Sequence, residues 1–500
     1  MKIIEPKISE NGLKIVAKRY LLKNETVGQM MWRVCQHLAK AEINWGDYSK
    51  IEEIADKFYE RMVNLKFVIA GRAMYEAGNP NGTGQLASCF VLPVEDDIPS
   101  IFKTLGQAAV IHKNNGGTGF NFSNIRPKGD KVKGVENAAS GPIDFLSAFS
   151  AALSKILQGS KRNGANIGIL NVDHPDILDF IKLKDEDGTI KNFNISIGIT
   201  NQFMEAVEVD KDWELINPRN GQVVKKIKAK KLFEEIAKHS WLTGDPGIAF
   251  IDRMNEDNPT PDLGKIEATN PCGEIPLLPF ESCNLASIVL SNHVVKNAQG
   301  KYEIDWEDLE KTVKLGVRLL DNMIEINNFP LPEIENMVKH GNRRIGLGVM
   351  GFAHLLFLLQ IPYDSQEAVR LSERLAKFIH KNSEEMSLQL GKERGVFGNW
   401  DRSIYAGSAE KYRNCALNMI APTGTISLFA NCSSGIEPVF SLITLKKAFF
   451  EDDKKSKPTQ ELMIIDPVFE QKLKDIAKNQ KLRDEILKQV ALDNSLKNIK

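Results

Sequence analysis

The sequence predicts an α/β protein. From about residue 88 onward, short apolar runs alternate with longer stretches of helical periodicity, which is the pattern of strands interleaved with helices. The composition is that of an ordinary globular chain, with 42% hydrophobic and 26% charged residues. Its 500 residues allow about three domains, or one large barrel with additions.

The first 70 residues are predicted to be helical. Residues 26–41 and 51–65 carry apolar side chains at helical spacing, and Cys35 in the first of these is expected to be a core residue. Turn-forming residues at 78–84 predict a loop. A short buried strand at 88–93 and a helix at 98–113 follow.

The rest of the chain continues this alternation. A long amphipathic pattern predicts a helix at 306–326. The final segment, 446–500, is Lys-rich with a helical pattern, interrupted by a loop at 452–458. Strands are predicted at residues 165–172, 195–200, 286–290, 344–350 and 416–420.

Charge and cysteine content exclude several classes of protein. Lys plus Arg and Asp plus Glu both number 65, which argues against binding to nucleic acid through bulk charge. The longest apolar run, 345–359, is shorter than the ~20 residues that span a membrane. We read no signal peptide and expect a cytoplasmic protein. Six cysteines without a C-x-x-C pair predict neither a disulfide scaffold nor a zinc ribbon, and no metal site is expected from the histidines.

A glycine-rich segment at 116–121 has two interpretations. Its three glycines allow backbone amides to approach a ligand, but the spacing fits no nucleotide-binding motif, and a tight turn between elements explains it equally well.

The segment Asn-Pro-Cys-Gly-Glu at 270–274 is more specific. In an extended stretch, Asn270, Cys272 and Glu274 share one face, so that an amide, a thiol and a carboxylate converge on one ligand. The flanking Pro and Gly favour a loop at the tip of a finger inserted into a cavity. The alternative is a surface turn with an incidental cysteine.

Two further segments hold candidate groups. Cys89 and Cys283 open apolar strands, and each alone is read as core; whether they meet at disulfide distance cannot be decided from positions 194 apart. Residues 421–427 (Ala-Pro-Thr-Gly-Thr-Ile-Ser) combine a turn, two Thr hydroxyls and a helix start, which suits an anionic phosphate. The alternative is a helix N-cap alone.

Together these segments resemble the catalytic chain of ribonucleotide reductase, most closely the adenosylcobalamin-dependent (class II) form. The resemblance spans nearly the whole chain. It rests on 88–89, 116–127, 162–164, 270–277, 282–287, 344–351 and 421–440.

The resemblance implies a ten-stranded α/β barrel with an N-terminal helical region, 1–75, and a barrel at 76–445. It implies that Cys272 becomes a thiyl radical, that Glu274 is a general base and Asn270 a substrate ligand, and that Cys89 and Cys283 supply two electrons as they form a disulfide. We expect Cys272 inside a closed cavity, facing the other two sulfurs. The substrate is expected to be a ribonucleotide, with a diphosphate favoured.

The resemblance also assigns binding residues. The positions that match substrate contacts are Ser88, Gly164, Pro422, Thr423, Gly424 and Thr425. Asp96 and Arg162, with the segments 159–162 and 184–194, match the region where a deoxynucleotide or ATP effector selects the substrate base.

The family's last strands and a C-terminal cysteine pair have no match, so 446–500 is expected to extend an incomplete barrel. A second polypeptide completing it, a homodimer, and thioredoxin or a similar reductant are the expected partners. Two alternatives remain open. One is a class I chain with a separate metal-radical subunit; the other is a nucleotide-binding chain inactive without its C-terminal part.

Overall fold

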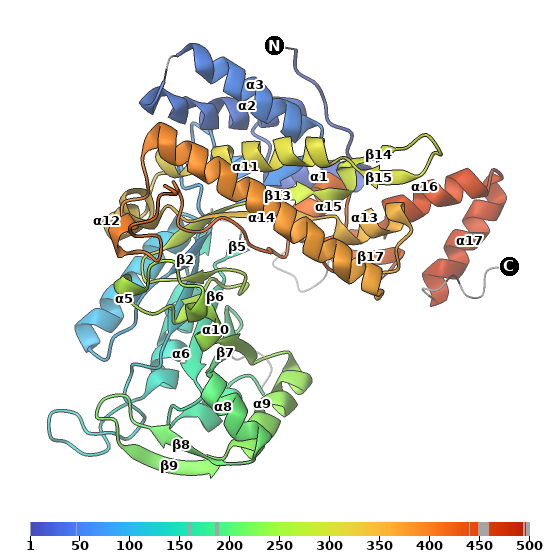
Figure 1. Cartoon of the computed structure of the whole chain (residues 1–500). Coiled ribbons are helices and arrows are strands. Elements are labelled where there is room, and N and C mark those ends of the chain that lie inside the picture. Colours follow the sequence, from blue (N-terminus) through green and yellow to red (C-terminus); the bar gives the residue numbers. More distant parts are fainter. Residues whose placement is uncertain are drawn as a thin grey trace.

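A computed structural model describes residues 2–46, 48–158, 162–185, 190–439, 441–448, 460–493 and 496, with the backbone alone at 157–158, 162–163, 445–448, 460–463 and 493. Figure 1 shows helices α2 (Val27–Ala39) and α3 (Ser49–Val63) on one side of the long helices α11 (Trp306–Ile326) and α14 (Gln366–Arg394), and most of the parallel strands on the other.

Three helices form the N-terminal region: α1 (Glu10–Arg19), α2 (Val27–Ala39) and α3 (Ser49–Val63). The helices predicted at 26–41 and 51–65 are confirmed as α2 and α3. Thr26 starts α2 with a capping box, in which Thr26 and Gln29 each accept a hydrogen bond from the other's backbone amide. Cys35 is fully buried, as expected for a core residue. A short helix, α4 (Gly71–Glu76), runs across the expected domain boundary at 75, and that boundary stays a prediction.

The central element is an eight-stranded sheet in the described part of the chain. Five strands, in the order β2-β3-β6-β7-β10, run parallel to one another. Strand β13 pairs antiparallel with β2 and with β1, and parallel with β16 on its other edge. The strands are β1 Phe67–Ile69, β2 Cys89–Val91, β3 Gly117–Asn121, β6 Asn166–Asn171, β7 Phe193–Ile199, β10 Gly247–Phe250, β13 Ser282–Val289 and β16 Ile345–Met350.

The α/β prediction is therefore confirmed, and so are the strands predicted at 88–93, 165–172, 195–200, 286–290 and 344–350. Residues 116–121 contain strand β3, so the tight-turn interpretation was wrong. The strand predicted at 416–420 was also wrong. The amides of Ile345 and Leu347 donate hydrogen bonds to the carbonyls of Ala416 and Leu417. Because the donors are two residues apart and the acceptors are adjacent, the regular strand pairing is interrupted. Only a single β-bridge between Leu347 and Asn418 remains among these residues.

Helices cover one face of this sheet. The helices predicted at 98–113 and 306–326 match α5 and α11 in both bounds. No helix in the described ranges has the length and apolar character needed to cross a membrane. The remaining helices are α6 Pro142–Leu153, α7 Ile177–Ile181, α8 Asn201–Glu208, α9 Ala229–Thr243, α10 Ile251–Glu256, α12 Pro332–Met337, α13 Phe352–Leu359, α14 Gln366–Arg394 and α15 Ile426–Ala430.

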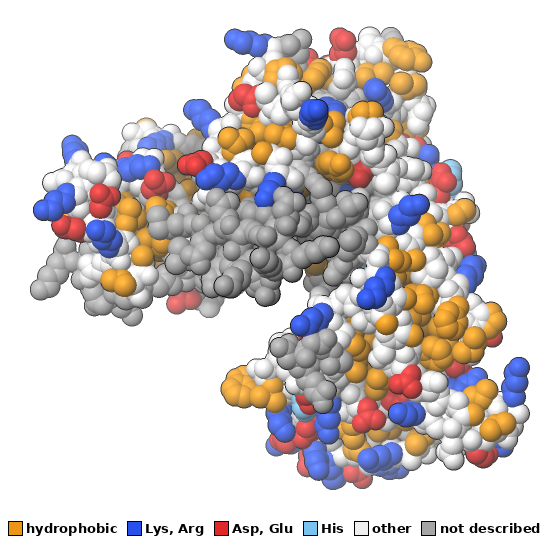
Figure 2. Space-filling model, turned by 180° about the vertical axis from the view of Figure 1, so that it is seen from behind, with side chains coloured by type: hydrophobic (Ala, Val, Ile, Leu, Met, Phe, Trp, Pro, Cys, Tyr) orange, Lys and Arg blue, Asp and Glu red, His pale blue; other side chains and the backbone are white. Residues whose placement is uncertain are grey.

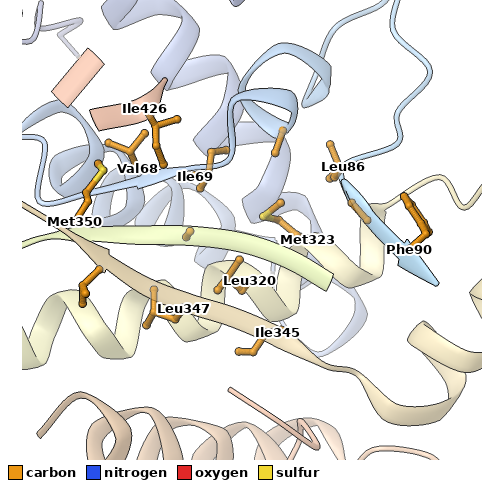
Figure 3. Close-up of a cluster of buried hydrophobic side chains, with 14 of the residues drawn as sticks. Val68, Ile69, Leu86, Phe90, Leu320, Met323, Ile345, Leu347, Met350 and Ile426 are labelled. Carbon is orange, nitrogen blue, oxygen red and sulfur yellow. The ribbon is translucent and has the colours of Figure 1, made fainter. Parts of the chain in front are cut away.

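The sheet is buried on both faces, and alternate residues of a strand contribute to different apolar clusters. On the outer face, Ile345 and Leu347 of β16 pack with Leu320 and Met323 of α11, as Figure 3 shows. On the inner face, Val91, Ile167 and Cys283 belong to a second cluster that includes Ala268, Ile275 and Leu277. A chain segment at 268–277 therefore fills the concave side of the sheet.

The C-terminal segment differs from the prediction in part. Strands β17 (Ile443–Ala448) and β18 (Gln460–Ile465) pair antiparallel, where a helical pattern was expected from residue 446. Helices α16 (Pro467–Ile476) and α17 (Gln480–Asp493) follow and project to one side in Figure 1. The loop predicted at 452–458 lies wholly outside the described residues, which break off between 448 and 460.

Three further antiparallel strand pairs complete the fold: β4–β5 (Leu157–Gln158 and Arg162–Asn163), β8–β9 (Asp212–Ile216 and Val223–Lys228) and β14–β15 (Val294–Lys296 and Tyr302–Ile304). On the face drawn in Figure 2, basic and acidic side chains are interspersed, in line with equal numbers of the two charges.

Candidate active site

The centre of the site is a hairpin on the concave side of the sheet, which we call the finger hairpin (residues 268–277). Its arms are β11 (Ala268–Thr269) and β12 (Pro276–Leu277). At its tip, the Gly273 amide donates to the Asn270 carbonyl at 3.0 Å, and Asn, Pro and Gly occupy the first, second and fourth positions that a type I turn favours. Gly273 has φ +83°, a left-handed conformation that suits glycine. The extended-strand interpretation was therefore wrong, while the predicted loop tip is confirmed.

Glycines in β3 allow this hairpin to lie directly on the sheet. A Cβ atom on Gly119 would be 1.8 Å from the Thr269 carbonyl oxygen, and one on Gly117 would be 3.0 Å from Cγ of Pro271. The Asn194 Nδ2 also donates to the Pro271 carbonyl at 2.8 Å. The glycine-rich sequence therefore serves close packing of the hairpin against a strand.

Asn270 connects the hairpin tip to the strands. Its Nδ2 donates to the Cys89 Sγ at 3.2 Å and to the Glu274 Oε2 at 2.7 Å. Its Oδ1 accepts a hydrogen bond from the Ile275 amide at 3.1 Å. This bond orients the side chain so that its Nδ2 faces the Cys89 thiol. Of the predicted trio Asn270, Cys272 and Glu274, the structure thus joins Asn270 and Glu274 by a hydrogen bond, produced by a turn instead of an extended strand.

Cys89 and Cys283 lie opposite each other as register partners on the antiparallel strands β2 and β13. Such partners have Cα atoms about 4.5–5.5 Å apart, within the roughly 4.4–6.8 Å range of disulfides. All six cysteines lie in the described part of the chain, and each is a thiol outside any disulfide. The pair is therefore positioned to form one.

Cys272 is exposed at the hairpin tip, so the expectation of a closed cavity around it was wrong. The hairpin packs on the sheet through Thr269 and Pro271, whereas Cys272 and Gly273 occupy the solvent side of the turn. Its sulfur is still close enough to Cys89 for its charge to raise the pKa of that thiol. The three cysteines are thus neighbours, with one of them open to solvent.

The pKa values of Cys89, Cys283 and Glu274 are all raised, which favours the neutral, protonated form of each side chain. Burial raises the pKa of Cys89 and of Cys283 well above the usual thiol value, and nearby negative groups, first Glu274 for Cys89, add to the effect. Burial also raises the pKa of Glu274, against the hydrogen bond from Asn270 that lowers it. Both thiols are thus kept in the form that donates hydrogen.

Ser88 and Gly164, predicted substrate contacts, lie at the edge of this site. The Ser88 hydroxyl accepts from the Arg72 Nε at 3.3 Å. Gly164 is buried, and a Cβ there would be 2.0 Å from the Nδ1 of His112. Gly164 also lines a pocket of about 400 Å³, together with Ser150, Ala151, Ser154, Ala165, Asn166, Ile190, Lys191, Asn192 and Asn194.

The segment 422–425 forms a turn before α15. The Thr423 hydroxyl accepts from the Gly435 amide at 2.7 Å, and the Thr425 hydroxyl accepts from the Arg19 Nη1 at 3.5 Å. Thr425 is the N-cap residue of α15, as one interpretation of this segment expected, but its side chain makes no capping hydrogen bond to the helix. Ala421, next to this segment, belongs to the same inner apolar cluster as Cys283.

Asp96, the predicted effector contact, forms an ion pair with Arg126, with 2.7 Å between the Asp96 Oδ2 and the Arg126 Nε. Arg162 lies in β5, and its side chain is outside the described part of the structure. Residues 159–161 and 186–189 of the two predicted effector segments are also outside the described residues. Within the described ranges, no group of three or more His, Cys, Asp or Glu side chains is arranged to hold a metal ion.

Sequence reasoning missed four polar residues that contact this region. Arg72 reaches Ser88, Arg126 reaches Asp96, Asn194 reaches Pro271, and Arg344 forms an ion pair with Glu281 beside Cys283. Arg126 and Arg344 stood in segments that carried the resemblance, but spacing along the chain gives no signal for contacts between residues 30 or 63 positions apart.

Comparisons with known proteins identify the family of this chain. Residues 6–82 match a family model described as the ribonucleotide reductase all-alpha domain, and residues 87–412 and 407–500 match one described as the barrel domain. A vitamin B12-dependent ribonucleoside-diphosphate reductase of Thermoplasma acidophilum is 40% identical, over 99% of this chain and 70% of the relative.

A protein with the same description from Mycobacterium tuberculosis is 42% identical, over 88% of this chain and 63% of the relative. A ribonucleoside-diphosphate reductase subunit alpha of Chlamydia trachomatis is 29% identical, over 78% of this chain and 43% of that relative. The chain spans about two thirds of the length of the first two relatives and less than half of the third. This chain belongs to the ribonucleotide reductase family.

Proposed function

We propose that this chain reduces ribonucleotides, with a diphosphate as the favoured substrate, to 2′-deoxyribonucleotides. The observation that carries the proposal is the position of Cys89, which pairs with Cys283 on one side and accepts a hydrogen bond from Asn270 of the finger hairpin on the other. A radical reduction of a sugar requires a dithiol, which supplies two electrons, and a third, separate thiol, which carries the radical.

Each side chain has a role that its surroundings support. The thiyl radical of Cys272 takes the 3′ hydrogen atom of the ribose, while Glu274 accepts the proton of the 3′ hydroxyl. Asn270 orients the substrate through its amide. Cys89 protonates the departing 2′ hydroxyl, which leaves as water, and Cys89 and Cys283 give up two electrons and two protons in total as their disulfide forms. Cys272 regains its hydrogen atom at the end.

The cofactor we propose is adenosylcobalamin, which supplies, when bound, a carbon-centred radical able to take a hydrogen atom from a thiol. The exposure of Cys272 and Gly273 is compatible with binding of this cofactor, because a large cofactor can reach an exposed sulfur at the tip of a turn but cannot reach a sulfur buried against the sheet. Two relatives described as vitamin B12-dependent are 40% and 42% identical to this chain. The alternative is a separate metal-radical subunit; the relative from Chlamydia trachomatis is described as a subunit alpha, which is compatible with a partner subunit.

The phosphate groups are proposed to bind at 422–425. This segment carries two hydroxyls, and Arg19 of α1 reaches Thr425 with a guanidinium. Ser88 and Gly164 are proposed to contact the rest of the nucleotide, because they flank Cys89 and the 400 Å³ pocket respectively.

Nucleotide effectors are proposed to bind near Asp96, with Arg126 and Arg162. Beside this region, α5 exposes Ile98, Phe102 and Val110 on one stripe, with 56%, 56% and 39% of their surfaces exposed. An apolar helical stripe of this kind supports a homodimer through α5. Thioredoxin or a similar dithiol protein is the proposed reductant, and a second polypeptide completing the barrel is a further proposed partner.

The test is an assay with ribonucleoside diphosphates, with and without adenosylcobalamin, in the presence of dithiothreitol. We expect deoxynucleotide only with the cofactor, none from Cys272→Ser, and wild-type activity from Cys35→Ala, a cysteine buried in the N-terminal helices. Product formed with an added metal-radical subunit instead supports the alternative. Product formed by Cys272→Ser contradicts the radical role.

A further inference from the structure

Arg344 is a buried arginine beside the cysteine pair that the proposed chemistry does not use. Only 8% of its surface is exposed. Its Nε lies 3.2 Å from the Glu281 Oε1, and its Nη2 is buried with no hydrogen-bond partner among the described residues. A buried guanidinium normally has partners for all of its donors, so the unused donor needs an explanation.

The register of the sheet places this guanidinium next to Cys283. Asn284 pairs with Ile345 on the parallel strands β13 and β16, so Cys283 and Arg344, one residue earlier on each strand, lie side by side. Ile345 and Leu347 face α11 on the outer side, as Figure 3 shows. Arg344 therefore faces the inner side, as Cys283 does.

The position of Gly346 supports the same arrangement. A Cβ on Gly346 would lie 3.0 Å from the Cys283 Sγ, so the sulfur lies against the inner face of β16, on which Arg344 is the preceding inward position. Cys89, Cys283 and Arg344 thus form a row across β2, β13 and β16.

The two sulfurs of this row differ in access and in charge. Cys89 is 6% exposed and Cys283 is 1% exposed, so an incoming thiol reaches Cys89 first. Besides Cys89 itself, the charged groups that face Cys283 are Arg344, which lowers its pKa, and Glu281 and Glu274, which raise it. Cys89 faces Glu274 and Cys272, which raise its pKa, and Asn270 and Arg72, which lower it. The guanidinium beside Cys283 therefore stabilises a negative charge on that sulfur.

We propose that Arg344 is a positioning residue that directs the re-reduction of a Cys89–Cys283 disulfide, so that a dithiol reductant attacks Cys89 and the Cys283 sulfur departs toward the guanidinium. This inference rests on the proposed function, which makes that disulfide.

The thiol–disulfide exchange conserves bonds, electrons and protons. A thiolate of the reductant bonds to the Cys89 sulfur, the Cys89–Cys283 bond breaks, and Cys283 leaves as a thiolate held by Arg344, later taking a proton. In the mixed disulfide, the reductant's first sulfur is bonded to Cys89. The second thiol of the reductant then attacks that first sulfur and releases Cys89. The dithiol loses two electrons and two protons, and the two cysteines gain them.

The test uses protein oxidised with diamide, so that no ribonucleotide is needed. A monothiol, cysteamine, is added briefly, and the peptides that carry Cys89 and Cys283 are analysed by mass spectrometry. We expect cysteamine mainly on Cys89 in the wild type. In Arg344→Met we expect dithiothreitol to reduce the disulfide at least about fivefold more slowly, because the leaving thiolate is less stable, and the preference for Cys89 to fall.

Three variants separate this role from a structural one. Glu281→Gln/Arg344→Met removes both charges, avoids leaving Glu281 without its arginine, and is expected to react as slowly as Arg344→Met. Arg344→Lys is expected to recover part of the rate. Cys415→Ala is expected to react like the wild type; it removes another thiol whose pKa Arg344 lowers.

Cysteamine found mainly on Cys283, or a wild-type reduction rate in both Arg344→Met variants, overturns the inference and leaves the proposed function standing. If diamide fails to join Cys89 to Cys283, the redox pair of the proposed function is wrong as well.

Discussion

Cys89 and Cys283 are register partners on antiparallel strands, although 194 residues separate them in the chain. The sheet therefore holds two buried thiols at disulfide spacing before any chemistry occurs. The finger hairpin brings Asn270 and Glu274 to the same place, where Asn270 donates hydrogen bonds to both Cys89 and Glu274.

The first prediction concerns the glycine on which the hairpin rests. In Gly119→Ala the new methyl group overlaps the Thr269 carbonyl, so the finger hairpin must move away from the sheet. We expect the deoxynucleotide yield to fall at least about tenfold, because misplaced reacting groups lose the advantage of orientation. Hydrogen exchange across 268–277 should rise in parallel.

Gly46→Ala is the matched control for this change. A Cβ at Gly46 makes only ordinary contacts, at 3.6 Å to the Lys50 side chain and 3.7 Å to the Glu42 carbonyl. It should leave both activity and exchange in the hairpin unaltered. Full activity in Gly119→Ala contradicts the account of why β3 is rich in glycine.

The second prediction concerns Glu274 and pH. Burial raises the pKa of Glu274 above its usual value, and the proposed base acts as the carboxylate. Turnover should therefore decline as pH falls through this raised pKa, and Glu274→Gln should lose about a hundredfold or more in rate along with this acid limb. Rate measurements across pH on both proteins check this, and an unaltered acid limb in Glu274→Gln assigns it to another group.

The same shift makes a prediction for stability. A carboxyl group whose folded pKa is raised destabilises the fold once it is ionised, so its unfavourable contribution develops as pH rises from the unfolded value of 4.5. Glu274→Gln should be more stable than the wild type at pH 7, and the difference should vanish below that value. Urea unfolding at pH 4 and pH 7 measures it; a variant less stable at pH 7 argues against burial as the cause.

The fold and the site could be predicted from the sequence to different extents. Helices 98–113 and 306–326 were predicted with the observed bounds, because their apolar periodicity is long and their ends carry caps, Asp97 and Asp305. β3 was not predicted, because its sequence is rich in glycine. Glycine is needed there for the close contact with Thr269, which lies 150 residues away in the chain. β9 (Val223–Lys228) was missed because it is mostly exposed and lacks alternation.

In the site, the turn at 270–273 is local and could be predicted from the residues Asn-Pro-Cys-Gly. The partners Arg126 of Asp96 and Arg344 of Glu281 were not readable, because tertiary packing alone selects them. The exposure of Cys272 was likewise missed, since the sequence does not show which side of the turn faces the sheet.

The fourth prediction concerns the attachment of the N-terminal helices. Glu42 is buried and accepts hydrogen bonds from Arg318 and Arg394 of the long helices α11 and α14, with N to O distances of 2.7–2.8 Å. Burial acts to raise the pKa of Glu42, but these arginines outweigh it and lower the pKa to about 2. The ionised form therefore stabilises the fold.

This stabilisation is present above the unfolded pKa of 4.5 and is lost as pH falls toward 2. At pH 7, Glu42→Gln should lower the free energy of unfolding by about 3 kcal/mol. The loss should shrink steadily between pH 4.5 and pH 2.5, as followed by urea unfolding. Glu53→Gln, an exposed change on the neighbouring helix α3, is the control and should have little effect. An equal loss at all pH values contradicts the electrostatic explanation.

The measurement that tests the central claim most directly is a single turnover without external reductant. The reduced protein is mixed with adenosylcobalamin and a ribonucleoside diphosphate, and product and disulfides are quantified together by chromatography and peptide mass spectrometry. The account predicts one deoxynucleotide for each disulfide formed, with that disulfide joining Cys89 to Cys283. Product formed while those two thiols stay reduced, or a disulfide between any other pair, contradicts it.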